Sequence, residues 1–489
     1  MVMDRLIVLS FALLFVSGCT LGPDFFRPAS SVDVSAGFIN EISVSSDKKK
    51  SVNRWWERIE DPLLDGYVVQ LLESNLALRE ASERIIQASE RSKVARGDYA
   101  PVLGGGGAGG RSFVPGTGAQ ASERIYTNSY SAELTASWQI DLFGKIRRSV
   151  EAANAGFKAS VYDRQALTHS LIAELLNRRV AIAIHQNLRE LARQNAKNRQ
   201  NIYELVKRRY DLGVRGTALS DVYLAEDSFT SVASDAYRFE RLLVDDVYRL
   251  DVLLGQLPGT TNVLQGAFPL LPLPLDVPAC MPANLLDRRP DLRASELRLK
   301  AANADVGIAI ADLYPSLNLG GALGFSGNET RNFFTADQLA GSILASLTTR
   351  LFEGGKLRAN IRLQESEVRE LAAGYAEDVL NAVREVETAL QAEQKLDSEI
   401  HNTQRSVDAL RKAEQLSQER YIRGILTLKD YLDIQQRRYF GEQALLATQQ
   451  EKWNVRVSLY MALGGDWLGD PAVLKDNVIN ACETAGVEL

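Results

Sequence analysis

The stretch LREASERIIQASERSKVARGDYAP, residues 78–101, has a counterpart in LRASELRLKAANADVGIAIADLYP, residues 292–315. Further pairs follow in the same order, each displaced by about 210 positions: Leu142-Phe143 with Leu351-Phe352, Arg209-Tyr210 with Arg420-Tyr421, and Leu254-Gly255 with Leu463-Gly464. Matches that keep their order over nearly the whole chain indicate a tandem duplication. We therefore expect two copies of one unit, 63–270 and 287–466, with a Pro-rich linker at 271–286 and a C-terminal tail at 467–489.

The first residues combine a basic side chain with a short apolar run. Arg5 precedes the run from Leu6 to Val16, and Ser17-Gly18-Cys19 follows it. A run of this length is typical of a secretory signal and is too short to span a membrane. We predict a signal peptide at 1–18 and an acylated extension at 19–62 that begins with Cys19, a lipobox-like arrangement. A plain export signal with an incidental Cys is the alternative.

Charge and cysteine content narrow the classes of protein. The net charge is −6, and no basic patch or acidic block favours a nucleic-acid partner. Cys280 and Cys482 follow Cys19, and both a disulfide between them and two separate thiols remain open. No later stretch offers the ~20 continuous apolar residues of a membrane-spanning helix. If the chain crosses a membrane, it must do so as strands.

Proline placement predicts where long helices lie. No Pro occurs between Pro115 and Pro258 or between Pro315 and Pro471, and an interior Pro costs a helix about 3 kcal/mol. We expect long helices near 146–211 and 357–422, each roughly 100 Å long at 1.5 Å per residue, and returning helices near 217–255 and 427–463. Leu167, Leu171 and Leu175 recur at the spacing of a coiled-coil seam.

A different period precedes each long helix. From Tyr126 to Leu142, mostly apolar even positions alternate with polar odd positions, which predicts a strand with one apolar and one wet face. Similar alternation from Leu317 to Phe325 and from Ile343 to Leu351 predicts two strands within 315–352, matching two within 101–141. A membrane strand needs only ~9 to 11 residues. A soluble sheet with one solvated face is the alternative.

Four strands are too few to close a barrel, and an open sheet edge is not tolerated in lipid. Several copies of the chain must therefore combine, and three copies would supply twelve strands. The expected fold is an α+β membrane protein, internally duplicated, in which a long α-helical coiled-coil barrel continues a trimeric 12-stranded transmembrane β-barrel with four strands per protomer.

The residues give little support to an enzyme. His169, His185 and His401 are scattered on expected helices without ligand-like spacing. The glycine run from Gly104 to Gly110 lacks the Lys-Ser/Thr of a phosphate-binding loop, so we interpret it as a strand of small residues. We expect no catalytic residue, no metal site and no cofactor.

Several motifs, in order on this duplicated frame, resemble one known family. They are Trp55-Trp56 with Asp61-Pro62-Leu63-Leu64, Arg288-Arg289-Pro290-Asp291-Leu292-Arg293, Tyr314-Pro315, and Leu463-Gly464-Gly465-Asp466-Trp467. The chain is similar over nearly its whole mature length to the outer-membrane efflux channels typified by TolC and its lipid-anchored NodT-type relatives. The resemblance implies a homotrimer anchored in outer-membrane lipid, with a helical tunnel through the periplasm.

The resemblance also implies a constricted periplasmic entrance at the tips of the helices. Asp430 and Asp433 would face the lumen there, since residues three apart share a helix face, and rings of carboxylates favour cations. The comparable contacts at the tip would be Tyr421, Arg423, Tyr210, Arg215 and Asp221. Leu426 stands where some members carry a locking Arg, so either an Arg or an apolar ring at Leu426 and Leu428 would close the entrance. Helix capping by Thr427 and Asp430 is the local alternative.

The expected function is the outer-membrane channel of a tripartite efflux system, passing small molecules from an inner-membrane pump of resistance-nodulation-division or major-facilitator type and its periplasmic adaptor. The alternatives are an exit duct for type I protein secretion and a lipid-anchored periplasmic scaffold without a pore. The residues leave open the exported substrate, the particular pump and adaptor, and the lock of the closed entrance.

Overall fold

The computed structural model describes residues 20–27, 55–115, 124–261, 269–270, 288–331 and 333–464. Several predictions concern positions outside the described residues: the signal peptide at 1–18, the acylated Cys19, the linker at 271–286, the pairing of Cys280 with Cys482, and the tail at 467–489. The chain forms two compact units, one built mainly from 84–161 and 294–375 and the other mainly from 162–293 and 376–489.

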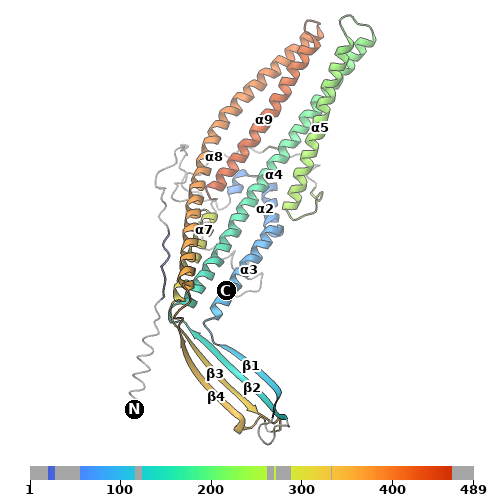
Figure 1. Ribbon diagram of the computed structural model, residues 1–489. Helices are drawn as coiled ribbons and strands as arrows, with labels where there is room; N and C mark the ends of the chain where they lie inside the picture. Colours follow the sequence, from blue (N-terminus) through green and yellow to red (C-terminus); the bar gives the residue numbers. More distant parts are fainter. Residues whose placement is uncertain are drawn as a thin grey trace. The chain divides into compact units, whose positions relative to one another are not determined.

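The first unit contains one four-stranded antiparallel sheet (Figure 1). Its strands are β1 (Val102–Pro115), β2 (Arg124–Ile140), β3 (Ser316–Gly327) and β4 (Leu339–Thr348), paired in chain order, with a short helix η4 (Ala336–Gln338) before β4. The central pairing joins β2 of the first copy to β3 of the second, with Leu134 opposite Leu323. The two copies of the duplication therefore share one sheet.

The glycine-rich strand β1 is a regular strand in spite of its composition. Glycine is depleted in strands because it has no side chain to pack and loses much backbone freedom on folding. The ring of Tyr130 on β2 lies over Gly109 on β1 and fills the space of the missing side chain, at about the distance at which a Cβ would touch it. Cross-strand aromatic cover of this kind stabilises a glycine in a sheet.

The helices begin with η1 (Trp55–Ile59), α2 (Pro62–Ser74), α3 (Leu76–Gly97), α4 (Lys145–Asp211) and α5 (Leu219–Leu253). The second copy supplies α7 (Pro290–Ala311), α8 (Lys356–Ile422) and α9 (Leu428–Ala462). The long helices α4 and α8 have 67 residues each, and the returning helices α5 and α9 have 35 each. In Figure 1 each long helix turns back into its returning helix as a hairpin.

The first copy has two helices, α2 and α3, before its strands. Asn75 interrupts them in an extended conformation. Its side-chain oxygen accepts from the Leu78 amide, and its side-chain nitrogen donates to the carbonyl of Leu253 at the end of α5. Asn75 thus caps α3 and ties the break to α5, an arrangement that apolar periodicity does not reveal.

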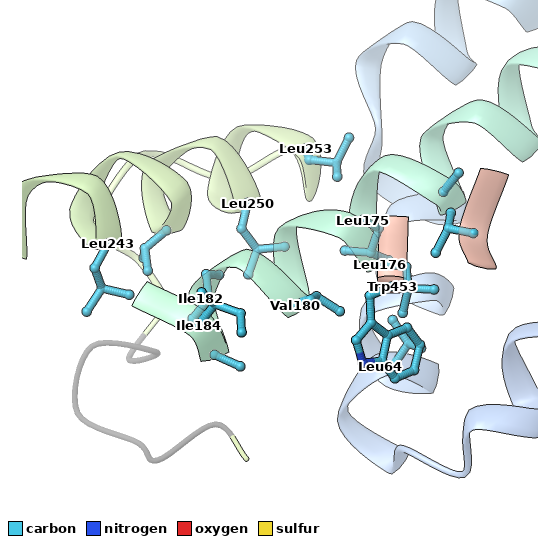
Figure 2. Packing of buried hydrophobic residues seen from close by; sticks show 14 of the residues in the cluster. Leu64, Leu175, Leu176, Val180, Ile182, Ile184, Leu243, Leu250, Leu253 and Trp453 are labelled. Atoms are coloured by element: carbon cyan, nitrogen blue, oxygen red, sulfur yellow. The ribbon is translucent and has the colours of Figure 1, made fainter. Parts of the chain in front are cut away.

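The main core of the second unit packs α2, α4, α5 and α9 together. Figure 2 shows Leu64, Leu175, Leu176 and Trp453 gathered at one end of this cluster and Ile182, Ile184, Leu243 and Leu250 at the other. The predicted seam lies in this core, with Leu171 and Leu175 buried and Leu167 packed against them. Burying such a side chain contributes about 1.5 to 3 kcal/mol.

Two of the motifs named from the sequence stabilise the ends of helices. Asp61 caps α2 by accepting from the Leu63 amide, and its other oxygen accepts from buried Arg179 of α4 at 3.1 Å. Arg289 pairs with Asp291 at 2.7 Å and with Glu385 of α8 at 2.7 Å. Both motifs therefore have a structural role, because a buried guanidinium is costly unless its charge is paired.

Candidate functional site

The strand register separates the side chains of the sheet onto two faces. Residues directly opposite one another share a face, and neighbours along a strand alternate. One face carries Leu103, Phe113, Tyr126, Tyr130, Leu134, Trp138, Ile140, Leu317, Leu319, Leu323, Phe325, Leu339, Ile343 and Leu347. The other face carries, apart from the apolar Val102, Val114, Ile125 and Leu344, mainly polar side chains: Thr127, Ser129, Ser131, Glu133, Thr135, Ser137, Gln139, Ser316, Asn318, Ser326, Ser342, Ser346 and Thr348.

The apolar face is exposed in the single chain. Ile343 is 93% exposed, Leu347 67% and Leu134 66%. A contiguous apolar surface of this kind marks contact with lipid or protein. Among the described residues, the sheet order also leaves β1 and β4 each with one unpaired edge, and unpaired backbone groups are not stable against lipid. A single chain is therefore an incomplete form of this sheet.

Aromatic side chains mark both ends of the strands. Where the strands meet the helices, Trp138 donates its indole N–H to the Tyr99 carbonyl at 2.9 Å, and the rings of Phe143 and Tyr314 lie 4.9 Å apart. The end with the strand-to-strand connections carries a second group: Phe113, Tyr126, Tyr130, Phe325, Phe333 and Phe334. Aromatic girdles at both interfaces, flanking an apolar band, are typical of membrane strands.

A peptide strap, defined as residues 20–27, lies against the first unit at the start of α4. Arg148, whose side chain is only 4% exposed, donates to the carbonyls of Leu21 at 3.1 Å and Gly22 at 3.2 Å. At the other end of the strap, Arg27 forms a two-pronged ion pair with Glu296, with a shortest distance of 2.6 Å. The strap therefore fixes the residue that follows Cys19 beside the ends of the strands.

The tips of the two helical hairpins have similar turns. Gly213 and Gly424 follow α4 and α8 with φ of 68° and 75°, the left-handed conformation that favours glycine after a helix. Thr427 then caps α9 by accepting from the Asp430 amide and donating to its carboxylate at 2.7 Å. At the first tip, the Asp221 carboxylate accepts from the Ala218 amide. The two predicted acids Asp430 and Asp221 thus close matching first turns.

Asp430 and Asp433 are both exposed on the first turns of α9. Asp430 interacts with Thr427, and Asp433 pairs with Arg437 at 2.8 Å. Ion pairs of exposed side chains are weak, typically under about 1 kcal/mol. Both carboxylates therefore stay accessible to mobile ions.

The two predicted leucines occupy different environments. Leu428 is 7% exposed and packs with Val206, Val222 and Ala225 between the two hairpins. This burial corrects the expectation for Leu428, because its side chain belongs to the core of the protomer and is not available to line a pore. Leu426, in the turn, is half-buried.

Tyr421 joins three helices at the second tip. Its ring stacks on Tyr431 of α9 at 5.4 Å, and the guanidinium of Arg209 of α4 lies 5.7 Å from its centre. Burial raises the pKa of Tyr421, and burial together with Glu414 raises the pKa of Tyr431 to about 12. Both rings are therefore neutral at physiological pH and serve as packing and hydrogen-bonding groups.

The other predicted tip residues do not join this contact. Tyr210, Arg215 and Arg423 are exposed. Within the part of the chain that the structure describes, neither Arg215 nor Arg423 forms an ion pair. These side chains are therefore available to a neighbouring chain.

A polar network that no sequence motif predicts lies further along α9. Tyr439 donates to Asp235 of α5 at 3.0 Å, and Arg438 donates to Asn195 of α4 at 2.5 Å. Arg199 of α4, 3% exposed, lies 6.0 Å from the centre of the Tyr439 ring. The network fixes α9 against the first hairpin. Its members are single residues on three helices without a common spacing, so no sequence motif predicts the network.

Among the described residues, no helix combines the length and the apolar character needed to cross a bilayer.

Comparison with known proteins identifies the class. The family model of outer membrane efflux proteins matches residues 67–256 and 281–465, most of both copies, and the chain belongs to this family. It is 28% identical to a probable efflux pump outer membrane protein, TtgC of Pseudomonas putida, over 94% of this chain and 96% of that one. It is 32% identical to the pyoverdine export outer membrane protein OpmQ of the same species, over 85% and 89%.

A solved structure agrees with this assignment. The outer-membrane channel OprN superposes with a TM-score of 0.81 at 30% identity, covering 92% of this chain and all of that one. The predicted family and the predicted location are confirmed. The chain is an outer-membrane efflux protein.

Proposed function

We propose that three copies of this chain close one twelve-stranded barrel in the outer membrane and continue it as a helical tunnel into the periplasm. The observation that carries the proposal is the four-stranded sheet, which has an exposed apolar face, a polar face and two unpaired edges. Pairing β4 of one copy with β1 of the next satisfies every edge. The apolar face then meets lipid and the polar face lines water, as in known membrane barrels.

The tips of the hairpins are the proposed periplasmic entrance. Three-fold symmetry would bring three copies of Asp430 and Asp433 around one axis, and a ring of carboxylates favours cations. Leu426 would form the apolar part of the constriction. Tyr421 and Asp221 support the tips from within each protomer, while Tyr210, Arg215 and Arg423 would contact neighbouring protomers.

The channel would act without catalysis of its own, as the outer part of a tripartite system. Its partners would be a periplasmic adaptor protein and an inner-membrane pump of resistance-nodulation-division or major-facilitator type. Relatives that are efflux or export proteins support small molecules as cargo, because TtgC and OpmQ are named for such roles. An acyl group on Cys19 would anchor the strap in the periplasmic leaflet, since residue 20 lies beside the ends of the strands.

Single-channel conductance of the purified protein in a planar bilayer tests this function. We expect small, cation-favouring currents whose selectivity falls on Asp430→Ala plus Asp433→Ala. A matched control, Glu226→Ala plus Asp227→Ala, removes two exposed acids from α5 and should leave the selectivity nearly unchanged. Currents with unaltered selectivity in the first variant would move the constriction elsewhere. No current from an assembled trimer would contradict the channel and favour a scaffold.

A further inference from the structure

Two arginines lie on the apolar face of the sheet, at the end with the strand-to-strand connections. Arg111 lies on β1, two residues before Phe113, and Arg124 lies on β2, two residues before Tyr126. Phe113 and Tyr126 are directly opposite each other. Because residues two apart on a strand share a face, all four side chains lie on the face that carries Leu103 and Leu134.

The four side chains form a single cluster. The Arg111 guanidinium lies 4.7 Å from the centre of the Tyr126 ring, and the Arg124 guanidinium lies 5.0 Å from the centre of the Phe113 ring. The two rings are 5.9 Å apart. The guanidiniums therefore approach one aromatic pair from opposite ends. An arginine stacked on a ring keeps its N–H groups free for an anion.

Neither charge is compensated by an ion pair within the described ranges. The basic residues where the strands meet the helices differ in this respect: Lys145 pairs with Asp312 at 2.6 Å, Arg147 with Asp141 at 3.3 Å, and Arg350 with Glu353 at 3.2 Å. Among the described arginines that lie within the strands, Arg111 and Arg124 are thus unpaired, and both lie on the apolar face at the opposite end.

The position of the cluster limits what can satisfy these charges. An arginine on the lipid face of a membrane barrel is strongly destabilising at the bilayer midplane but nearly neutral near the interface. The helices leave the other end of the sheet, so in the proposed barrel this end faces the cell exterior. The cluster then lies at the headgroup level of the outer leaflet, where aromatic rings are also favoured.

We propose that Arg111, Arg124, Phe113 and Tyr126 form a docking surface for an outer-leaflet lipid whose headgroup carries two phosphates. This inference rests on the proposed barrel. Guanidinium groups bind phosphate oxygens through paired, charge-assisted hydrogen bonds, and two of them beside one aromatic pair match a headgroup with two phosphates. The lipid would hold the β1–β2 hairpin at a fixed depth in the membrane.

Native mass spectrometry of the full-length assembled protein in detergent tests the proposal. The probes are hexa-acylated lipid A with two phosphates and the same lipid with its phosphates removed. We expect the wild type to bind the phosphorylated lipid roughly tenfold more tightly than the other, as two charge-assisted contacts would provide. Equal binding of both lipids would overturn the proposal without any variant being needed.

The arginines are then tested directly. Arg111→Gln plus Arg124→Gln should weaken binding of the phosphorylated lipid roughly tenfold. The control Arg331→Gln, an exposed arginine in the β3–β4 connection, should change it less than twofold. An equal loss in both variants, or none in the double variant, would contradict the assignment. If the Gln variant does not assemble, Arg111→Lys plus Arg124→Lys keeps the charge but removes the paired geometry and should bind with intermediate affinity.

Two further outcomes separate this proposal from related ones. Competition by inorganic phosphate at millimolar concentration would indicate a site for free anions and would contradict a lipid surface. A protein that conducts ions in the bilayer but binds both lipids equally would keep the proposed channel and reject only the docking surface.

Discussion

The rings of Tyr421 and Tyr431 stack with centroids 5.4 Å apart and planes only 10° apart, so α8 and α9 are joined directly behind the turn that connects them. The guanidinium of Arg209 reaches the same pair from α4. This aromatic pair thus joins the two helices of the second hairpin, α8 and α9, to each other and to α4 of the first hairpin. The contact lies at the proposed entrance.

Tyr421→Ala should loosen this tip. A stacked aromatic pair contributes about 0.5 to 1.5 kcal/mol beyond its buried area, so we expect amide exchange in residues 420–427 to accelerate roughly tenfold and the channel conductance to rise. Tyr421→Phe keeps the ring and is the matched control. If the Phe variant behaves like the Ala variant, the hydroxyl and not the stacking holds the tip.

Gly324→Ala should prevent correct pairing of β2 with β3. A Cβ at Gly324 would lie 2.5 Å from the Ala132 carbonyl oxygen and 2.7 Å from Glu133 Cα, whereas a Cβ at Gly106 meets nothing within 4 Å. Both glycines lie opposite Glu133, one on each side. We expect Gly324→Ala to abolish heat-modifiable migration on gels and Gly106→Ala to retain it. Retention by both variants would show that the register adjusts.

Gly22→Ala should release the strap. Gly22 has φ of 96°, and a Cβ there would lie 2.6 Å from Cα of Gly307. Strain of this kind costs on the order of 1 to 3 kcal/mol, so chymotrypsin cleavage after the exposed Phe26 should accelerate at least tenfold. The control Gly66→Ala, in the open on α2, should leave cleavage unchanged. Slow cleavage in both variants would mean that Arg148 and Arg27 hold the strap without the close approach of Gly22.

His169 should make stability depend on pH. Burial lowers the pKa of His169 from 6.5 to about 4, although the carboxylate of Asp291 opposes this shift. The unfolded chain then binds the proton more readily than the folded chain between these two pH values. Stability is therefore complete above pH 6.5 and falls towards pH 4, by on the order of 3 kcal/mol.

Thermal unfolding followed from pH 7 to pH 4 measures this effect. His169→Leu should flatten the dependence, while the control His401→Leu, at an exposed position of α8, should leave it unchanged. A dependence that is identical in wild type and His169→Leu would assign the acid sensitivity to other groups.

Local patterns in the sequence account for much of the strand and helix placement. The alternation from Tyr126 to Leu142 reflects one face against water and one against an apolar phase, and β2 spans Arg124–Ile140. Gly213 and Gly424 follow the long helices because a left-handed residue is needed there. The helical segment before the first strands is divided at Asn75, whose side chain accepts from the Leu78 amide of α3 and donates to the Leu253 carbonyl of α5.

The candidate site was less predictable. Asp430 was expected at the tip both as a helix cap and as a pore acid, and the capping contact to Thr427 is present. Leu428 was expected beside the pore, yet it is buried against Val222 of the other hairpin. Whether a leucine after a turn faces a lumen or a core depends on the neighbouring helix, which local sequence does not specify.

The duplication, the alternating pattern of the strands, the seam pattern of the long helices and the family all follow from residues near one another or from their order along the chain. The tertiary structure alone decided that β2 pairs with β3 across the two copies, that Tyr421 meets Arg209 and Tyr431, and that Arg111 and Arg124 share one aromatic pair. These contacts join residues that are separated along the chain, because only packing and strand register bring their segments together.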